Sequence, residues 1–188
     1  MVAKYTITKL KKDLKKLEHA ELVEILADLF KNDGKVQKIL TSRFIGEVYQ
    51  REMFDRYKEH IDNIFFPKRL NSTPSIKKAK AKIEEFKMIG SIEMILNLEL
   101  YTIECGFEFA STVGWENEDF FDVLCRMYSN FVNESDKIQD VEIQSEMSKR
   151  IKKMLYNTMD LGWGIEGAML ELTNDIPWMS GEYDIEDE

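Results

Sequence analysis

Residues 89–110 read IGSIEMILNLELYTIECGFEFA, the longest apolar stretch in this chain of 188 residues. Four glutamates interrupt it: Glu93, Glu99, Glu104 and Glu108. Because that is too many charges for a bilayer-spanning segment, no membrane partner is expected. Ser91 is a helix N-cap, and the residues after it are apolar around most of the helix circumference, which is typical of a helix packed on several sides. The stretch therefore predicts a central helix over about residues 92–113.

Helical periodicity continues on both sides of this central helix. Turn residues at 32–34 and at Pro67 end predicted helices, and Ser75 and Asn117 are N-caps of others, so we expect about nine helices. No segment combines strict alternation with β-branched residues and turn signals, so the fold class is all-α without strands. Short connections favour antiparallel αα-hairpins around the central helix, and a solenoid of helix pairs stays open as the alternative.

A glycine inside the central helix predicts a close contact with another helix. Gly106 lies in its interior, where a glycine costs about 1 kcal/mol relative to alanine. We therefore expect another helix to cross close to this position.

Length and composition favour one domain. A chain of this size buries roughly 70% of its unfolded surface, and a hydrophobic content of 44% with three prolines indicates a compact globule. We expect residues 1–175 to form a single helical domain and residues 176–188 an acidic, partly disordered tail. Cys105 and Cys125 lie in apolar helical surroundings as small buried thiols, and nothing requires a disulfide. Together with an N-terminus that has no signal-peptide core, they favour a cytoplasmic protein.

The net charge of −9 is unevenly distributed. Residues 88–125 contain eight acidic residues and no Lys or Arg, whereas residues 68–87 contain seven basic and two acidic residues. The basic residues singled out as candidates for binding a partner are Lys68, Arg69, Lys77, Lys78 and Lys80. Three interpretations stay open for them: the solvated face of an amphipathic helix, a contact with the chain's own acidic segment, or a contact with an external anionic partner. The acidic total argues against general nucleic-acid binding.

Paired carboxylates on the central helix are the first candidates for chemistry. Glu104 and Glu108 are four residues apart and so share one helix face. A ferritin-like di-iron site would also need Glu-x-x-His on two helices, but the residues three before His19 and His60 are Lys16 and Tyr57. Glu104 and Glu108 are therefore weak candidates for a carboxylate-only divalent metal site, beside the interpretation that the glutamates are solvated or paired with lysines.

The glycine-rich stretch at residues 162–167, GWGIEG, matches the dinucleotide-binding pattern letter for letter. That pattern binds a pyrophosphate only between a strand and a helix. The residues before it have helical periodicity up to about Leu161, so we expect no cofactor there. We expect Gly162 to cap the preceding helix, and Trp163 to pack into the core or at the rim of a groove.

The sequence contains no recognisable catalytic motif. No nucleophile elbow or phosphate-binding loop is present, so no catalytic residue is proposed and the balance leans away from an enzyme. Trp115 and Trp163, each beside a glycine, are the aromatic candidates for lining a partner groove.

Four motifs together resemble an uncharacterised bacterial family known only as a domain of unknown function. They are Phe65-Phe66-Pro67-Lys68, the helix from Ala79 to Phe86, Tyr101 followed by Gly106-Phe107-Glu108-Phe109, and Gly162-Trp163-Gly164. The resemblance implies a bacterial, cytoplasmic, all-helical protein. It brings no reaction and no catalytic residues.

The leading hypothesis is a non-enzymatic scaffold or adaptor that binds another protein. The alternatives are a divalent-metal-binding protein or enzyme centred on Glu104 and Glu108, and a regulator of nucleic-acid machinery. The ten methionines and eleven phenylalanines leave a homo-oligomer open, because they fit either a large core or an apolar surface.

Overall fold

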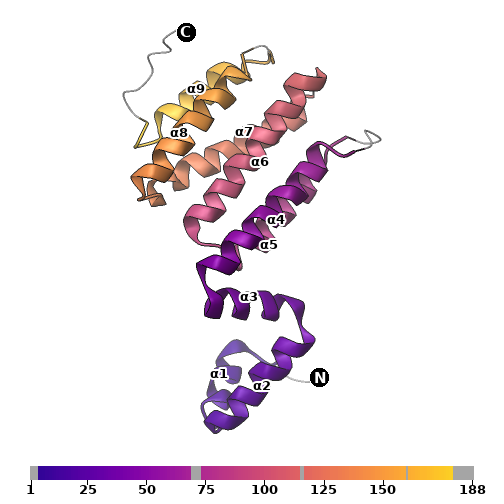
Figure 1. Cartoon of the computed structure of the whole chain (residues 1–188), viewed down its shortest axis with the longest axis vertical. Helices are drawn as coiled ribbons and strands as arrows, with labels where there is room; N and C mark the ends of the chain where they lie inside the picture. Colours follow the sequence, from indigo (N-terminus) through magenta and orange to yellow (C-terminus); the bar gives the residue numbers. More distant parts are fainter. Residues whose placement is uncertain (1–3, 69–72, 115–116, 160, 180–188) are drawn as a thin grey trace. The chain divides into compact units, whose positions relative to one another are not determined.

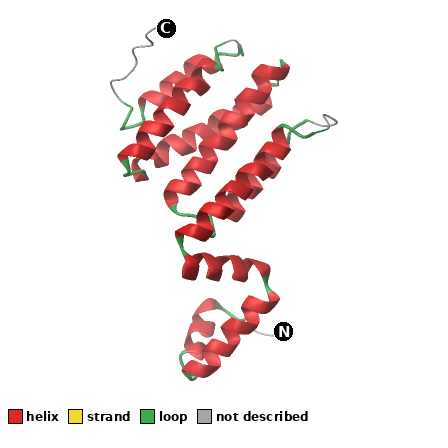
Figure 2. Ribbon diagram, in the orientation of Figure 1, coloured by secondary structure: helices red, strands yellow, loops and turns green. Residues whose placement is uncertain are grey.

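The computed structural model describes residues 4–68, 73–114, 117–159 and 161–179, and over these ranges the protein is all-helical (Figures 1 and 2). Nine α-helices and one 3₁₀ turn are found there, with no strand, which confirms the predicted fold class. None of the described helices combines the length and the apolar character needed to cross a membrane. The chain divides into two compact units, Met1–Glu47 and Val48–Glu188. The single domain expected from length stays a prediction.

The N-terminal unit consists of α1 (Ile7–Leu14), α2 (His19–Asn32) and α3 (Gly34–Ile45). Thr6 caps α1 by accepting a hydrogen bond from the amide of Lys9. Asp33 alone connects α2 to α3, and its carboxylate accepts hydrogen bonds from the amides of Lys35 and Val36. Because the connection is a single residue, α2 and α3 are held in contact with each other.

Apolar side chains of the N-terminal unit are poorly covered by its own helices. The only buried residue that α1, α2 and α3 contain is Ser42. The large apolar side chains that stay exposed here are Tyr5, Ile7, Leu10, Val23, Ile25, Leu26, Leu29, Phe30, Ile39, Phe44 and Ile45. The buried hydrophobic residues that the structure describes all lie between Met53 and Met179, in the second unit. The N-terminal unit therefore has helices but no core of its own.

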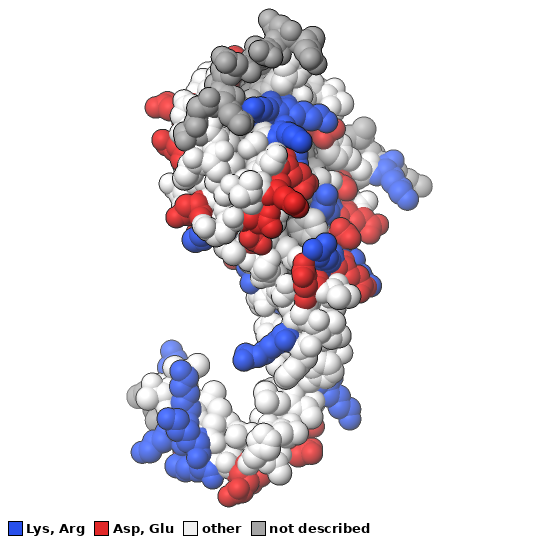
Figure 3. Space-filling view, turned by 60° about the vertical axis from the view of Figure 1, so that its left-hand side comes forward, with Lys and Arg blue, Asp and Glu red and all other residues white. Residues whose placement is uncertain are grey.

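Charges within this unit are divided among its helices. Helix α2 carries Glu21, Glu24 and Asp28, whereas α3 carries Lys35, Lys38 and Arg43 and no acidic residue. Helix α1 contains three lysines and one aspartate. Lys16 and Asp13 at the end of α1 form an ion pair, with Nζ 2.7 Å from Oδ1, and Figure 3 shows the charged side chains of the molecule.

The second unit contains the remaining helices. They are α4 (Glu47–Phe65), α5 (Ile76–Phe86), α6 (Ile92–Val113), α7 (Glu118–Glu134), the 3₁₀ turn η1 (Ser135–Lys137), α8 (Val141–Tyr156) and α9 (Ile165–Asn174). The caps predicted from sequence are confirmed: the side chains of Ser75, Ser91 and Asn117 each accept a backbone hydrogen bond at the start of α5, α6 and α7. These local signals place the starts of three helices around the core.

Helix α6 is the central helix, as predicted, and it contacts α5, α7, α8 and η1. Leu96, Leu98 and Leu100 are all fully buried. Since successive helix residues are about 100° apart, Leu98 points away from the side shared by Leu96 and Leu100. Helix α6 is therefore covered on opposite sides, which its nearly continuous apolar sequence requires.

Gly106 lies where Leu124 of α7 packs directly against α6. A Cβ atom at this position would lie 2.5 Å from Cδ2 of Leu124 and 2.8 Å from its Cδ1. Leu124 is itself fully buried, so it has little room to move away. The close crossing predicted from the glycine is confirmed.

The C-terminal part of the chain differs from expectation in two places. Helix α8 ends at Tyr156 and Asn157 is its cap, so the prediction that it extends to Leu161 with Gly162 as cap is wrong. Residues 176–179, predicted as the start of a tail, are packed instead: Ile176 and Met179 are buried in the core. Residues 180–188 lie outside the described part of the chain.

We expect Gly106→Ala to destabilise the protein by up to about 2 kcal/mol. Overpacking against Leu124 costs about 1–3 kcal/mol, while the better helix propensity of alanine returns about 1 kcal/mol. In a Leu124→Ala background the clash is absent, and the same substitution should stabilise by up to about 1 kcal/mol. Urea unfolding of the four proteins of this double-mutant cycle measures the change.

Gly167 of α9 is the matched control, because a Cβ atom there would meet no atom within 4 Å. Gly167→Ala should therefore be neutral or stabilising in both backgrounds. An equal loss from Gly106→Ala with and without Leu124 would contradict the close-crossing interpretation.

Candidate functional site

Two polar hollows adjoin the central helix, one on the side of α4 and α8 and one on the side of α5 and α7. The first has a volume of about 300 Å³ and contains both candidate metal ligands, Glu104 and Glu108. The second has a volume of about 370 Å³ and contains Lys80.

Arg150 of α8 closes one side of the first hollow. Its Nε and Nη2 donate to the two carboxylate oxygens of Glu104 at 2.9 and 2.7 Å, and its Nη1 donates to Oδ1 of Asn97 at 2.7 Å. The side chains of Arg150 and Glu104 are only 23% and 19% exposed. Asn97 and Glu104 are two helical turns apart on α6, so one guanidinium clamps both turns to α8.

A second polar cluster joins α4 to α6 in the same hollow. The Tyr101 hydroxyl donates to the carboxylate of Asp62, and the thiol of Cys105 lies 3.8 Å from the same carboxylate oxygen. The Nζ atom of Lys58 lies 4.3 Å from the centre of the Tyr101 ring. Lys58 and Asp62 are one helical turn apart on α4, as are Tyr101 and Cys105 on α6. Two matching pairs of polar residues therefore face each other.

The thiol and the phenol of this cluster are held in their protonated forms. Burial, and next the negative charge of Asp62, raise the pKa of Cys105 to about 12. Burial, and next the hydrogen bond to Asp62, raise the pKa of Tyr101 well above its ordinary value. At neutral pH both groups are hydrogen-bond donors, whereas a nucleophile needs the deprotonated form.

Glu104 and Glu108 differ in their surroundings. Glu104 is engaged by Arg150, while Glu108 is exposed. Among the described residues, no three His, Cys, Asp or Glu side chains are grouped so that they could hold a metal ion. Glu104 is thus neither solvated nor paired with a lysine, as the sequence interpretation had it, but paired with an arginine.

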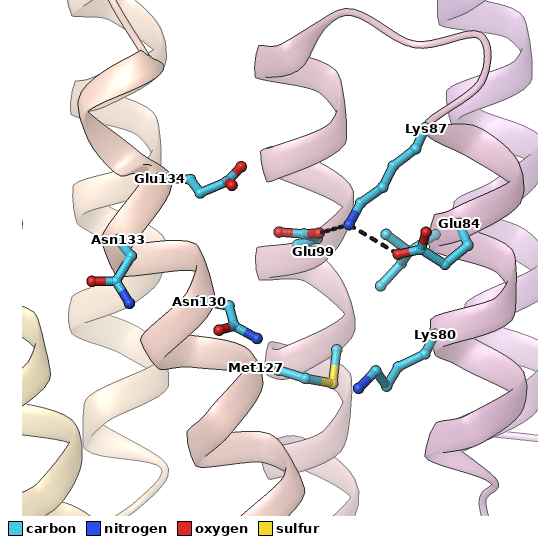
Figure 4. A pocket seen from close by; sticks show the side chains of 9 residues that line it. Lys80, Glu84, Lys87, Glu99, Met127, Asn130, Asn133 and Glu134 are labelled. Carbon is cyan, nitrogen blue, oxygen red and sulfur yellow. Dashed lines mark ion pairs between the residues drawn. The ribbon is translucent and has the colours of Figure 1, made fainter.

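The second hollow lies between α5, α6 and α7 (Figure 4). Nζ of Lys87 is 2.9 Å from a carboxylate oxygen of both Glu84 and Glu99, and Figure 4 shows it between the two. Burial alone would lower the pKa of the Lys87 amine, but the two carboxylates more than offset this and raise it. Lys87 belongs to the basic stretch and Glu99 to the acidic one, so the two stretches contact each other here.

The basic candidate residues do not form one site. Lys80 extends from α5 across the hollow toward Met127 of α7 (Figure 4), while Lys77 and Lys78 are exposed and line neither hollow. Lys68 is exposed after α4. Arg69 and Trp115 lie outside the described residues.

Trp163 occupies an exposed turn, here called the Trp163 turn (residues 162–165). Gly162, Trp163 and Gly164 all have positive φ, at 71°, 55° and 71°. The amide of Ile165 donates to the carbonyl of Gly162 at 3.1 Å, so the two central residues have the positive φ of a type I′ turn. Trp163 is 63% exposed, which places it at the surface and not in the core. Sequence reasoning found the residue but missed its backbone, because tryptophan is not a signal for this turn.

Comparison with known protein families, with curated proteins and with solved structures gives no match for this chain. The resemblance based on the four sequence motifs stays a prediction.

We expect Arg150→Met to destabilise the protein by about 2–3 kcal/mol, because it leaves the half-buried Glu104 and Asn97 without their partner. Adding Glu104→Gln should recover a substantial part of the loss, since the unpaired charge is then gone. Urea unfolding measures both. Lys153→Met, on the same helix and exposed, is the control and should change stability by less than about 0.5 kcal/mol. If Arg150→Met lowered the free energy of unfolding equally in the unsubstituted protein and in the Glu104→Gln background, this account would be contradicted.

Alkylation by iodoacetamide tests whether the buried thiol of Cys105 stays protonated. Because the thiolate is the reacting form, a pKa of about 12 predicts a rate at pH 8 about a thousandfold below that of an ordinary exposed thiol. The rate should continue to rise about tenfold per pH unit through pH 10, where an exposed thiol has levelled off. Mass spectrometry of the peptide containing Cys105, with glutathione as reference, follows the reaction. Rapid modification at pH 7 would contradict the burial of the thiol.

Proposed function

We propose that the protein is a non-enzymatic adaptor that binds another protein, and that the Trp163 turn is one of its contact points. The observation that carries the proposal is a large aromatic side chain held mostly in solvent at a backbone conformation unfavourable to it. Tryptophan is among the residues most enriched at the energetic centres of protein interfaces. Its two side-chain torsions make it a large contact at low entropic cost.

The energetics of the turn support a role in binding. A non-glycine residue with positive φ costs of order 1–3 kcal/mol, and asparagine or glycine would be accommodated there more easily. Burial of the indole ring would offset that cost, but Trp163 is 63% exposed. The folded chain alone thus gains little from this residue, which is the behaviour expected of a contact residue.

Further exposed apolar side chains precede the turn along the chain. Tyr156 at the end of α8 is 71% exposed and Met159 is 40% exposed. Tyrosine, tryptophan and methionine are enriched in interface cores relative to the rest of a protein surface. Within eight residues the chain thus presents three side chains of the kinds that interfaces use.

Chemistry within the first hollow supports a non-enzymatic function. The Cys105 thiol and the Tyr101 phenol stay protonated, and Arg150 compensates the charge of Glu104. These groups hold α4, α6 and α8 together, so their positions follow from packing. Both cysteines are free thiols, which fits a reducing compartment, and we place the protein in the cytoplasm on that basis.

Trp163→Asn tests the proposal by separating stability from binding. Asparagine tolerates the positive φ, so the free energy of unfolding should change by no more than about 1 kcal/mol, where loss of a core aromatic costs about 3–5 kcal/mol. Binding should fall at least about tenfold, as for the loss of an interface anchor. The full chain and the variant are immobilised, and proteins retained from a native lysate at low salt are quantified by mass spectrometry.

Val141→Asn is the matched control, because Val141 is apolar, 74% exposed and at the other end of α8. It should retain the same proteins as the unsubstituted chain. Retention that is equal for Trp163→Asn and the control would count against the turn as a contact point. A loss of several kcal/mol in Trp163→Asn would show that the ring is structural.

A further inference from the structure

A third hollow, here called the α8 hollow, lies along one face of α8 and has a volume of about 380 Å³. Its polar lining from this helix consists of Gln144, Ser145, Ser148, Lys149 and Lys152. These positions repeat at the three- to four-residue spacing of one helix face, so their side chains are presented together. No Asp or Glu of the described residues lines the hollow, although α8 itself carries Glu142 and Glu146. The α8 hollow is therefore positively charged.

Two polar groups of the α8 hollow lack a partner in the described part of the chain. Ser148 is only 9% exposed, yet its hydroxyl forms no hydrogen bond with a described side chain or carbonyl. Lys149 is exposed and forms no ion pair with a described residue. A buried hydroxyl is normally hydrogen-bonded, because leaving it without a partner costs free energy. A hydroxyl and an ammonium group both donate to a carboxylate, so a carboxylate is the ligand that this lining suits.

The course of the chain brings carboxylates to the same place. Trp178 also lines the α8 hollow, where its Nε1 donates to the carbonyl of Ser135 at 3.0 Å. The next residue, Met179, is 1% exposed and so is fixed in the core. Residues 180–188 follow directly, and five of these nine residues are acidic and none is basic. Nine residues reach up to about 30 Å, whereas the lining from residue 144 to 152 rises about 12 Å along α8.

We propose that residues 180–188 of this chain cover the α8 hollow, with the carboxylates of Glu182 and Asp184 against the ammonium groups of Lys149 and Lys152. A single exposed ion pair is weak. Here the contact is intramolecular, however, because the segment is joined to a fixed residue at the hollow, and a short connection gives an effective concentration in the millimolar range. Since the contact is electrostatic, salt weakens it. The inference does not depend on the Trp163 turn.

Carbodiimide coupling of the full chain tests the contact directly, because this reagent joins an amine to a carboxylate that touches it. Mass spectrometry should find the acidic residues of 180–188 joined to Lys149 or Lys152 at least about fivefold more often than to Lys77 or Lys78. Those two lysines of α5 are the matched control, since they are exposed and line none of the three hollows. The preference should disappear in about 0.5 M NaCl. Coupling without this preference overturns the proposal.

A charge exchange tests which residues meet, with chymotryptic cleavage after Tyr183 as the measure of how well the segment is covered. Lys149→Glu/Lys152→Glu should speed cleavage at least about fivefold, as expected for the loss of two ion pairs. Glu182→Lys/Asp184→Lys should have the same effect, when each rate is divided by that of a synthetic peptide with the same segment and substitutions. All four substitutions together should return the normalised rate to within about twofold of the unsubstituted chain, because opposite charges meet again.

The control variant Lys77→Glu/Lys78→Glu makes the same change of net charge on α5 and should leave the cleavage rate unchanged. Circular dichroism checks that each variant keeps its helices. Equal acceleration by the two lysine double variants would show a general effect of charge and overturn the proposal. Failure of the fourfold variant to restore protection would overturn it as well.

Other occupants of the α8 hollow give different results. If the segment of a second copy fills it, coupling of a mixture of nitrogen-15-labelled and unlabelled chains joins labelled to unlabelled peptides, whereas the proposal predicts joined peptides of one label only. If an external anion fills it, the unsubstituted chain is cleaved as fast as the synthetic peptide. Either result overturns the proposal and leaves the test of the Trp163 turn unaffected.

Discussion

Burial of opposite sides of helix α6 is the constraint on which the second unit depends. With Leu96 and Leu98 both fully buried, neighbouring helices must cover more than one side of α6. Glu99 and Glu104 project at the edges of this apolar surface, and each is met by a basic side chain from an adjacent helix, Lys87 of α5 and Arg150 of α8. The polar hollows lie where these helices meet. Their charged residues thus act first as connections between helices.

Local signals account for what could be predicted from the sequence. Ser91 and Asn117 begin helices because a side-chain oxygen next to an apolar run satisfies a free backbone amide, and this needs no knowledge of the fold. The glutamates of α6 were interpreted as solvated or paired with lysines, whereas Glu104 is paired with Arg150, 46 residues away along the chain. Such a pairing follows from the packing of α6 on α8, which no local pattern contains. The end of α8 was misplaced because its helical periodicity continues past Tyr156, where the helix ends.

The two units show why periodicity does not reveal what covers a helix. Val23, Leu26 and Phe30 of α2 have the same apolar spacing as residues of the core helices, yet they remain exposed. Spacing identifies the apolar face of a helix, but the same face can be buried by its own chain, by another copy or by another protein. The expectation of one domain was drawn from length, which is insensitive to this difference.

The exposed residues of the two units are energetically unfavourable for different reasons. This difference suits the two units to different kinds of contact. At the Trp163 turn the unfavourable energy is in the backbone of one residue, which suits a small contact that can be made and broken. On α2 and α3 it is the exposure of a broad apolar surface, which suits a lasting contact.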